Sequence, residues 1–179
     1  MEPARHPGPD ISSAPHPLLH AMLMCDLAFQ DEASGKSVLV GVFEAVTAYQ
    51  FPARHGRLCV YAKLTDAQGE YRFRLDLVRL EDLAVVGQGQ FVATFSNRMV
   101  PFELGFQLFD TVFEQPGSYE FRLYANNRWL GSKSLSVVRA PEARPPADQI
   151  HVYGSTVSVR WLNFMLPSPR PAIDPPTEH

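Results

Sequence analysis

The chain has 179 residues, a formal net charge of −3 and a hydrophobic fraction of 45%. This length fits one domain with irregular ends, and the mixed charges exclude the strongly basic footprint of many nucleic-acid-binding proteins. Two cysteines suit a reducing compartment. With no apolar leader and no apolar run of about 20 residues, we expect a cytoplasmic protein without a membrane span.

Prolines mark the boundaries of the predicted folded region. Of the 16 prolines, all but three lie outside residues 20–139, and proline is excluded from sheet interiors because it cannot donate a ladder hydrogen bond. This distribution predicts a disordered tail over 1–17, a β-domain over 18–139, a proline-rich linker over 140–149 and a second disordered tail over 167–179.

Alternating apolar residues predict the first two strands. Residues 21–30 alternate with a period of two, which indicates a strand, and the polar run 31–36 with Gly35 forms a turn. The following run over 38–46 is apolar on both faces. It is interpreted as one strand in the middle of the architecture.

Four further strands are predicted before the clearest hairpin. Residues 58–65 have an inward row of alternate apolar side chains, and residues 72–80 repeat it until the phase changes at Val78 and Leu80, which indicates a bulge or the end of the strand. A fifth strand over 85–95 is loosened by two glycines, and a sixth covers 102–108.

The hairpin is predicted over residues 119–137. Asn126 and Asn127 tolerate the left-handed backbone of a tight turn, and no ten-residue segment of the domain has helical spacing with caps. Eight short strands favour a single antiparallel β-sandwich, immunoglobulin-like or C2-like, with a small barrel as the alternative. The predicted inward rows include Leu23 of the first strand, Val60 of the third, Leu104 of the sixth and Phe121 of the hairpin.

Residues 22–138 resemble an uncharacterised bacterial family of small β-sandwich domains of unknown function. The matching features are Asp26, the stretch from Gly35 to Phe43, the Phe51-Pro52 pair and the run Pro116–Leu123. They are mostly turn and core features. The resemblance therefore implies a fold, and it implies no activity and no catalytic residues.

Histidines and cysteines do not assemble a convincing metal site. His20 and Cys25 are five residues apart and fall on opposite faces of one strand, and no cysteine pair has zinc-ligand spacing. Cys25 belongs to the inward row and Cys59 is out of phase. We therefore expect a buried thiol at Cys25 and a half-buried one at Cys59 instead of a disulfide, and no metal or cofactor is assigned.

No catalytic residue is assigned either. The chain lacks a G-x-S-x-G nucleophile turn, and the two glycines near residue 88 lie in a strand with no helix after them, unlike a phosphate loop. Three acidic pairs in turns supply too few ligands for calcium: Asp31 and Glu32, Asp66 and Glu70, Asp110 and Glu114. Three strand glutamates are the candidates for paired catalytic carboxylates: Glu44, Glu103 and Glu120.

Basic residues on the third and fourth strands are balanced by acids. Six positive and five negative side chains between residues 52 and 82 indicate a solvated face with cross-strand pairs, which disfavours nucleic-acid binding. The six are Arg54, Arg57, Lys63, Arg72, Arg74 and Arg79.

The segment 150–166 is strongly apolar and follows a polar linker. So many adjacent apolar groups are costly in water. The segment is expected to return to its own domain as a ninth strand, to exchange with a second copy, or to engage another protein. Its candidate contact residues are Val157, Val159, Trp161 and Phe164.

These observations favour a non-catalytic protein-binding or assembly module. The partner would be another protein or a second copy of the chain, contacted through residues 150–166. The alternative is a hydrolase or carbohydrate-active enzyme on a β-sandwich, because a fold alone does not decide function. An enzymatic role is the weaker expectation, since no recognisable site is present.

Overall fold

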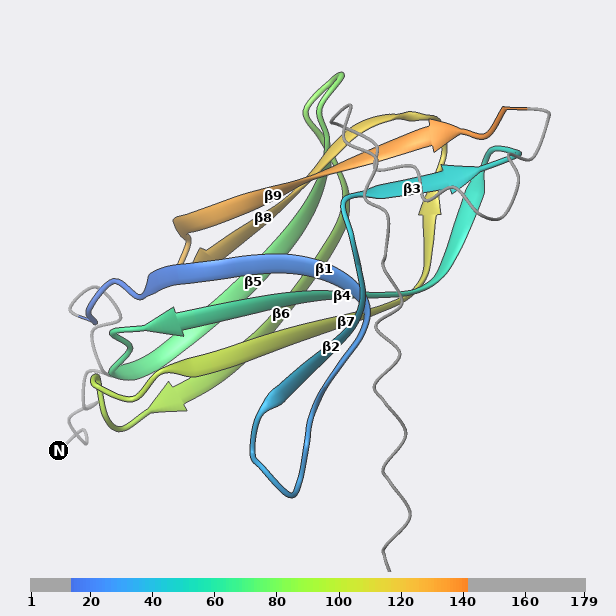
Figure 1. The fold of residues 1–179 in the computed structure, drawn as a ribbon. Coiled ribbons are helices and arrows are strands. Elements are labelled where there is room, and N and C mark those ends of the chain that lie inside the picture. The colour runs from blue at the N-terminus through green and yellow to red at the C-terminus, as the bar shows by residue number, and fades with distance from the viewer. Residues whose placement is uncertain (1–13, 142–179) are drawn as a thin grey trace, which may run out of the picture. The chain divides into compact units, whose positions relative to one another are not determined.

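The structure is a computed structural model that describes residues 14–141. Within this range the chain forms nine strands and no helix (Figure 1). The strands are β1 (Leu18–Gln30), β2 (Ser37–Phe43), β3 (Ala45–Ala48), β4 (Ala53–Thr65), β5 (Gly69–Arg79), β6 (Ala84–Phe95), β7 (Phe102–Phe113), β8 (Gly117–Ala125) and β9 (Arg128–Arg139).

Two sheets form the domain. One has four strands in the order β2-β1-β4-β7, and the other has five in the order β3-β9-β8-β5-β6. Every pair is antiparallel except β3 with β9, which is parallel. The prediction of a purely antiparallel arrangement is therefore wrong at this one edge.

The apolar run over 38–46 forms two strands, not one. β2 ends at Phe43 and β3 begins at Ala45, so the chain crosses from one sheet to the other at Glu44. Both strands lie at sheet edges instead of the middle, and β2 exposes Val40 and Val42. Apolar residues on both faces were a misleading signal here because the strand changes sheets within the run.

The core lies between the inner faces of the two sheets. Phe73 of β5 contacts Phe102 of β7 with ring centroids 6.1 Å apart, and Phe91 of β6 lies 5.3 Å from Phe106 of β7. The predicted inward rows of the third, fourth and sixth strands and of the hairpin are confirmed. Their buried members include Leu58, Val60, Ala62, Leu64, Phe73, Leu75, Leu77, Leu104, Phe106, Tyr119, Phe121, Leu123 and Leu135.

The inward row of the first strand is the opposite of the predicted one. Met22 and Met24 of β1 belong to the core, whereas Leu23 is half-buried and outside it. From Ala21 to Cys25 both phases of this strand are apolar, and Cys25 is fully buried although it lies outside the core between the sheets. Alternation therefore indicated a strand but could not say which face pointed inward.

Turn residues behave as their chemistry requires. Asn126 and Asn127 have positive φ angles of 48° and 64° between β8 and β9, as predicted for a tight turn. The register between β5 and β6 shifts between Leu77 and Val78. The predicted bulge therefore lies where the apolar phase changes.

The N-terminal residues before β1 contact the domain. The hydroxyl of Tyr71 donates to the Pro15 carbonyl over 2.8 Å, and Ala14 packs against the core. The predicted contact residues Val157, Val159, Trp161 and Phe164 lie outside the described residues, as do 1–13 and the rest of 142–179.

Candidate functional site

The four-stranded sheet is so strongly curled that it encloses a polar pocket. β1 pairs with β4 only up to Cys25, and then bends away to form a hairpin with β2 (Figure 1). The side-chain amide of Gln107 on β7 donates to the Ala28 carbonyl of β1 over 3.2 Å, although β4 lies between these strands in the sheet order. The hairpin therefore folds over the outer face of β4 and β7.

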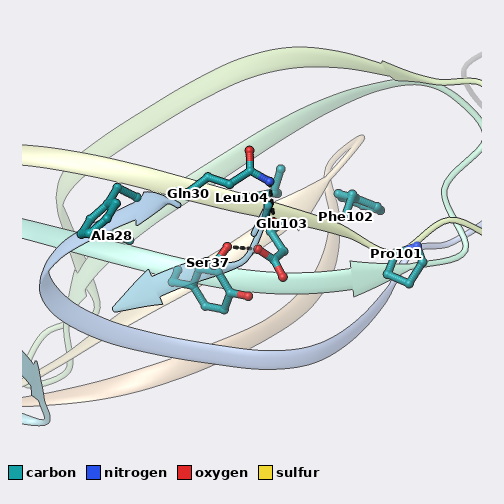
Figure 2. Close-up of a pocket in the computed structure, with 11 residues that line it drawn as sticks. Ala28, Gln30, Ser37, Pro101, Phe102, Glu103 and Leu104 are labelled. Carbon is teal, nitrogen blue, oxygen red and sulfur yellow. Dashed lines mark hydrogen bonds between the residues drawn. The ribbon is translucent and has the colours of Figure 1, made fainter. Parts of the chain in front are cut away.

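The pocket under this hairpin has a volume of about 450 Å³. Its walls come from the end of β1, the start of β2, the middle of β4 and the start of β7 (Figure 2). The polar side chains that line it are Gln30, Ser37, Tyr61 and Glu103.

Glu103 is the centre of the polar network. The Ser37 hydroxyl donates to its carboxylate (Figure 2), and the Lys63 ammonium lies 3.4 Å from the other carboxylate oxygen. The hydrogen bond from Ser37 is the main cause that lowers the pKa of Glu103 below its ordinary value. Burial, with the neighbouring Glu103 charge, raises the pKa of Tyr61 to about 12.

These shifts define what the pocket can do chemically. Glu103 stays ionised and Tyr61 stays protonated near neutral pH, so the pocket offers a hydrogen-bond acceptor beside a donor. A general acid or base needs a pKa near the working pH, and both groups are shifted away from it. The arrangement suits hydrogen bonding more than proton transfer.

Cys25 and Cys59 lie directly opposite each other on β1 and β4. Both are fully buried free thiols, and the Cys25 sulfur lies 3.8 Å from the Cys59 carbonyl oxygen. The predicted difference in phase is therefore wrong, because β1 turns its other face to the core. Burial raises the pKa of Cys59 to about 12 and also raises that of Cys25, which makes both poor nucleophiles and metal ligands.

The other residues considered for metal binding are dispersed. His20 hydrogen-bonds Thr65 over 2.7 Å, and His55 faces Asp26 at 3.7 Å. Residues 14–141 contain no group of three or more histidine, cysteine or acidic side chains arranged to hold a metal ion.

The glutamates considered as paired carboxylates belong to three different ion pairs. Glu103 pairs with Lys63, Glu44 with Lys133, and Glu120 with Arg122. Acidic turn residues are likewise engaged locally: Asp31 accepts from Ser34, and Asp66 pairs with Arg98. The basic strands carry matched acids, as in the Arg74–Asp76 pair at 3.2 Å.

A second hollow of about 650 Å³ lies between β6 and β7, the neighbouring edges of the two sheets. We call it the β6/β7 groove. Core side chains reach its floor, and Val86, Phe109 and Val112 line it while remaining exposed. Its described lining is apolar and amide-rich, with Glu114 as the one charged residue: Leu75, Leu77, Val86, Gly87, Gln88, Gly89, Gln90, Phe91, Gly105, Phe106, Gln107, Leu108, Phe109, Thr111, Val112, Glu114 and Phe121.

The sequence made Glu103 a candidate, but it did not indicate that Ser37 and Tyr61 share a pocket with it or that the β6/β7 groove exists. Both hollows depend on which strands become neighbours, and alternation carries no such information. The glycines at 87 and 89 were a local signal, because glycine inside a strand often marks a close backbone approach.

This geometry defines the class of protein. It is a domain of two facing β-sheets with a polar pocket and an apolar groove between β6 and β7. A family-wide sequence profile described as "Family of unknown function (DUF6941)" matches residues 20–138, and the chain belongs to this family. No curated protein matches the chain. Among the described residues, no helix is long and apolar enough to cross a membrane.

High pH should destabilise the fold through Cys59 and Tyr61. Burial raises both pKa values to about 12, from 9.0 and 10.0. The folded state therefore keeps protons that the unfolded state releases, and this contribution to stability is lost as the pH rises from 9 to 12. We expect the free energy of unfolding in urea to fall over this range.

The variant Tyr61→Phe should lose stability less steeply above pH 10 than the wild type. Tyr49→Phe, which removes an exposed phenol, is the matched control and should follow the wild type. An identical slope for Tyr61→Phe and Tyr49→Phe would contradict the assignment.

Proposed function

We propose that this chain is a non-catalytic protein-binding or assembly module. The observation that carries the proposal is the β6/β7 groove, an apolar hollow flanked by two sheet edges. Sheet edges bind extended segments by adding a strand, and adjacent apolar hollows take up the side chains of that segment. The exposed Val86 and Phe109 beside these edges would be covered by such a partner.

The chemistry of the polar pocket favours binding over catalysis. Its described lining includes one carboxylate, Glu103, whereas glycoside hydrolysis requires two. A hydrolase or carbohydrate-active enzyme remains the second candidate because Glu103, Ser37 and Tyr61 share one pocket.

The segment 150–166 is the second proposed contact. Its support is the apolar alternation around Val157, Val159 and Trp161, with Phe164 close behind. A second copy or another protein would cover these side chains. The same proposal assigns the chain to the cytoplasm of a bacterial cell, and its two sheets to an immunoglobulin-like or C2-like sandwich.

Site-specific photocrosslinking tests both contacts in the full chain. A benzophenone side chain at Val86 or Trp161 should yield a covalent protein adduct, identified by mass spectrometry as a second copy or as one defined partner. The control position is Val40, which lies on the edge of the other sheet and is about as exposed as Val86.

Each result has a definite meaning. Adducts from Val86 but not Val40 support the groove as the binding surface. Adducts from Trp161 alone would move the function to the segment 150–166 and overturn the role of the groove. No adduct from either position, in purified protein or in the producing cell, would reject the module.

A further inference from the structure

Cys25 and Cys59 form a facing pair at the point where β1 leaves β4. They are the last partners of the β1/β4 ladder, and the chain beyond Cys25 pairs with β2 in the hairpin (Figure 1). Opposite residues of antiparallel strands have Cα atoms about 4.5–5.5 Å apart and side chains on one face. A disulfide needs about 4.4–6.8 Å between Cα atoms, so this backbone holds the two cysteines within bridging distance.

The two side chains also approach each other on that face. Both are free thiols without solvent exposure, and the Cys25 sulfur lies 3.8 Å from the Cys59 carbonyl oxygen. The charge of a Cys25 thiolate is close enough to raise the pKa of Cys59. A bond between the sulfurs therefore needs no change of register and no change of strand face.

The cover over this pair is held by side-chain bonds instead of strand pairing. Ala28 of the hairpin donates its backbone N–H to the Cys59 sulfur and accepts from the Gln107 side chain over 3.2 Å. Farther along the hairpin, the Ser37 hydroxyl donates to Glu103. In its sheet β2 pairs with β1 alone. A segment attached in this way opens at a lower free-energy cost than unfolding of the whole domain.

We propose that Cys25 and Cys59 are an oxidation site, at which a peroxide forms a reversible disulfide that fastens the hairpin over the polar pocket. With the hairpin lifted, one thiolate attacks a peroxide oxygen, the O–O bond breaks and a sulfenic acid forms. The second thiolate attacks the sulfenic sulfur, the S–S bond forms and the sulfenic oxygen leaves as water. In total the two thiols lose two electrons and two protons, and hydrogen peroxide becomes two waters.

Burial decides when this reaction occurs. It raises the pKa of both thiols in the closed hairpin, so that both stay protonated and away from solvent at neutral pH. Lifting the hairpin removes the cover at Ala28 and brings both pKa values back toward 9.0, their ordinary value. The rate of oxidation therefore follows hairpin opening, and the disulfide then keeps the last pair of the β1/β4 ladder closed. A small dithiol reverses the step by thiol–disulfide exchange.

The test is mass spectrometry of the full chain after exposure to hydrogen peroxide in native buffer. The wild type should lose the mass of two hydrogen atoms and yield a peptide that links Cys25 to Cys59, and dithiothreitol should restore the starting mass. After oxidation, the backbone amides of residues 26–43 should exchange their hydrogens about 10-fold more slowly or less, because the hairpin opens less often.

A matched pair of variants tests the route through hairpin opening. Ser37→Ala removes the hydrogen bond to Glu103 and should speed disulfide formation about 5-fold or more. The control is Ser134→Ala, at an exposed position of β9 in the other sheet, which should react like the wild type.

A displaced thiol tests the geometry. Leu23→Cys/Cys25→Ala moves the thiol to the position opposite Tyr61, diagonal to Cys59 at about 7–8 Å, which is beyond the reach of a disulfide. This variant should stay unbridged while it is folded and should bridge as readily as the wild type in urea.

Several results would overturn the inference. The site is wrong if both thiols of the folded wild type stay free, if each is oxidised separately to a sulfinic acid, or if the displaced thiol bridges equally fast. Equal rates for Ser37→Ala and Ser134→Ala would reject the opening route, and unchanged amide exchange after oxidation would reject the fastening of the hairpin. These outcomes do not bear on the proposed protein contacts, which involve other surfaces.

Discussion

Replacing Phe73 with alanine is expected to lower the free energy of unfolding by about 3–5 kcal/mol. Phe73 is fully buried and contacts aromatic rings from three strands: Phe91 at 5.5 Å, Phe102 at 6.1 Å and Tyr71 at 5.9 Å. Its removal leaves a cavity where the two sheets meet, because strands fixed by hydrogen bonds on both sides cannot collapse into the space. Urea unfolding at neutral pH measures the loss.

The control for this prediction is Val92→Ala, at an exposed position on the adjacent strand, which should stay within about 0.5 kcal/mol of the wild type. A double-mutant cycle between Phe73 and Phe102 should show a coupling of about 0.5–1.5 kcal/mol, since aromatic pairs contribute that much beyond burial. Zero coupling would mean that the inner faces of the two sheets do not meet there.

The second large effect is expected at Gly41, where an alanine should cost about 2 kcal/mol or more. Gly41 has φ of 66°, and a Cβ atom there would lie 2.1 Å from a carboxylate oxygen of Asp26. The variant therefore incurs backbone strain and also displaces Asp26, which faces His55 at 3.7 Å. Thermal or urea unfolding measures both contributions together.

Two other glycines separate these contributions. Gly35 has φ of 67° but open space around it, so Gly35→Ala should cost only the left-handed backbone, about 1–2 kcal/mol. Gly56 has neither constraint, and Gly56→Ala should be close to neutral. Equal losses for the alanine variants of Gly41 and Gly35 would show that displacing Asp26 costs nothing.

This series explains part of the sequence resemblance in physical terms. Asp26, Gly35 and Gly41 belong to the sequence features that match the family. The structure places Asp26 directly over Gly41, and Gly35 in the turn between β1 and β2. The motif therefore specifies the hairpin that closes the polar pocket, and it carries no reactive group of its own.

The candidate sites were less predictable than the strands. Glu103 was one of three glutamates considered, with nothing in the sequence to favour it. Its partner Ser37 is 66 residues away in the chain, and the two meet because the hairpin folds back over β7. Cys25 and Cys59 were predicted to have different phases and instead face each other, since a strand that is apolar in both phases gives no reliable inward direction.

The printed residues were sufficient to predict an all-β domain, the inward rows of most strands, the bulge at Val78 and the turn at Asn126. These features depend on side-chain alternation and backbone preferences within a few neighbouring residues. The crossing at Glu44, the curl that forms the polar pocket and the β6/β7 groove are visible only in three dimensions. They depend on the pairing order of distant strands, which is set by the summed packing of the whole core and not by any local run of residues.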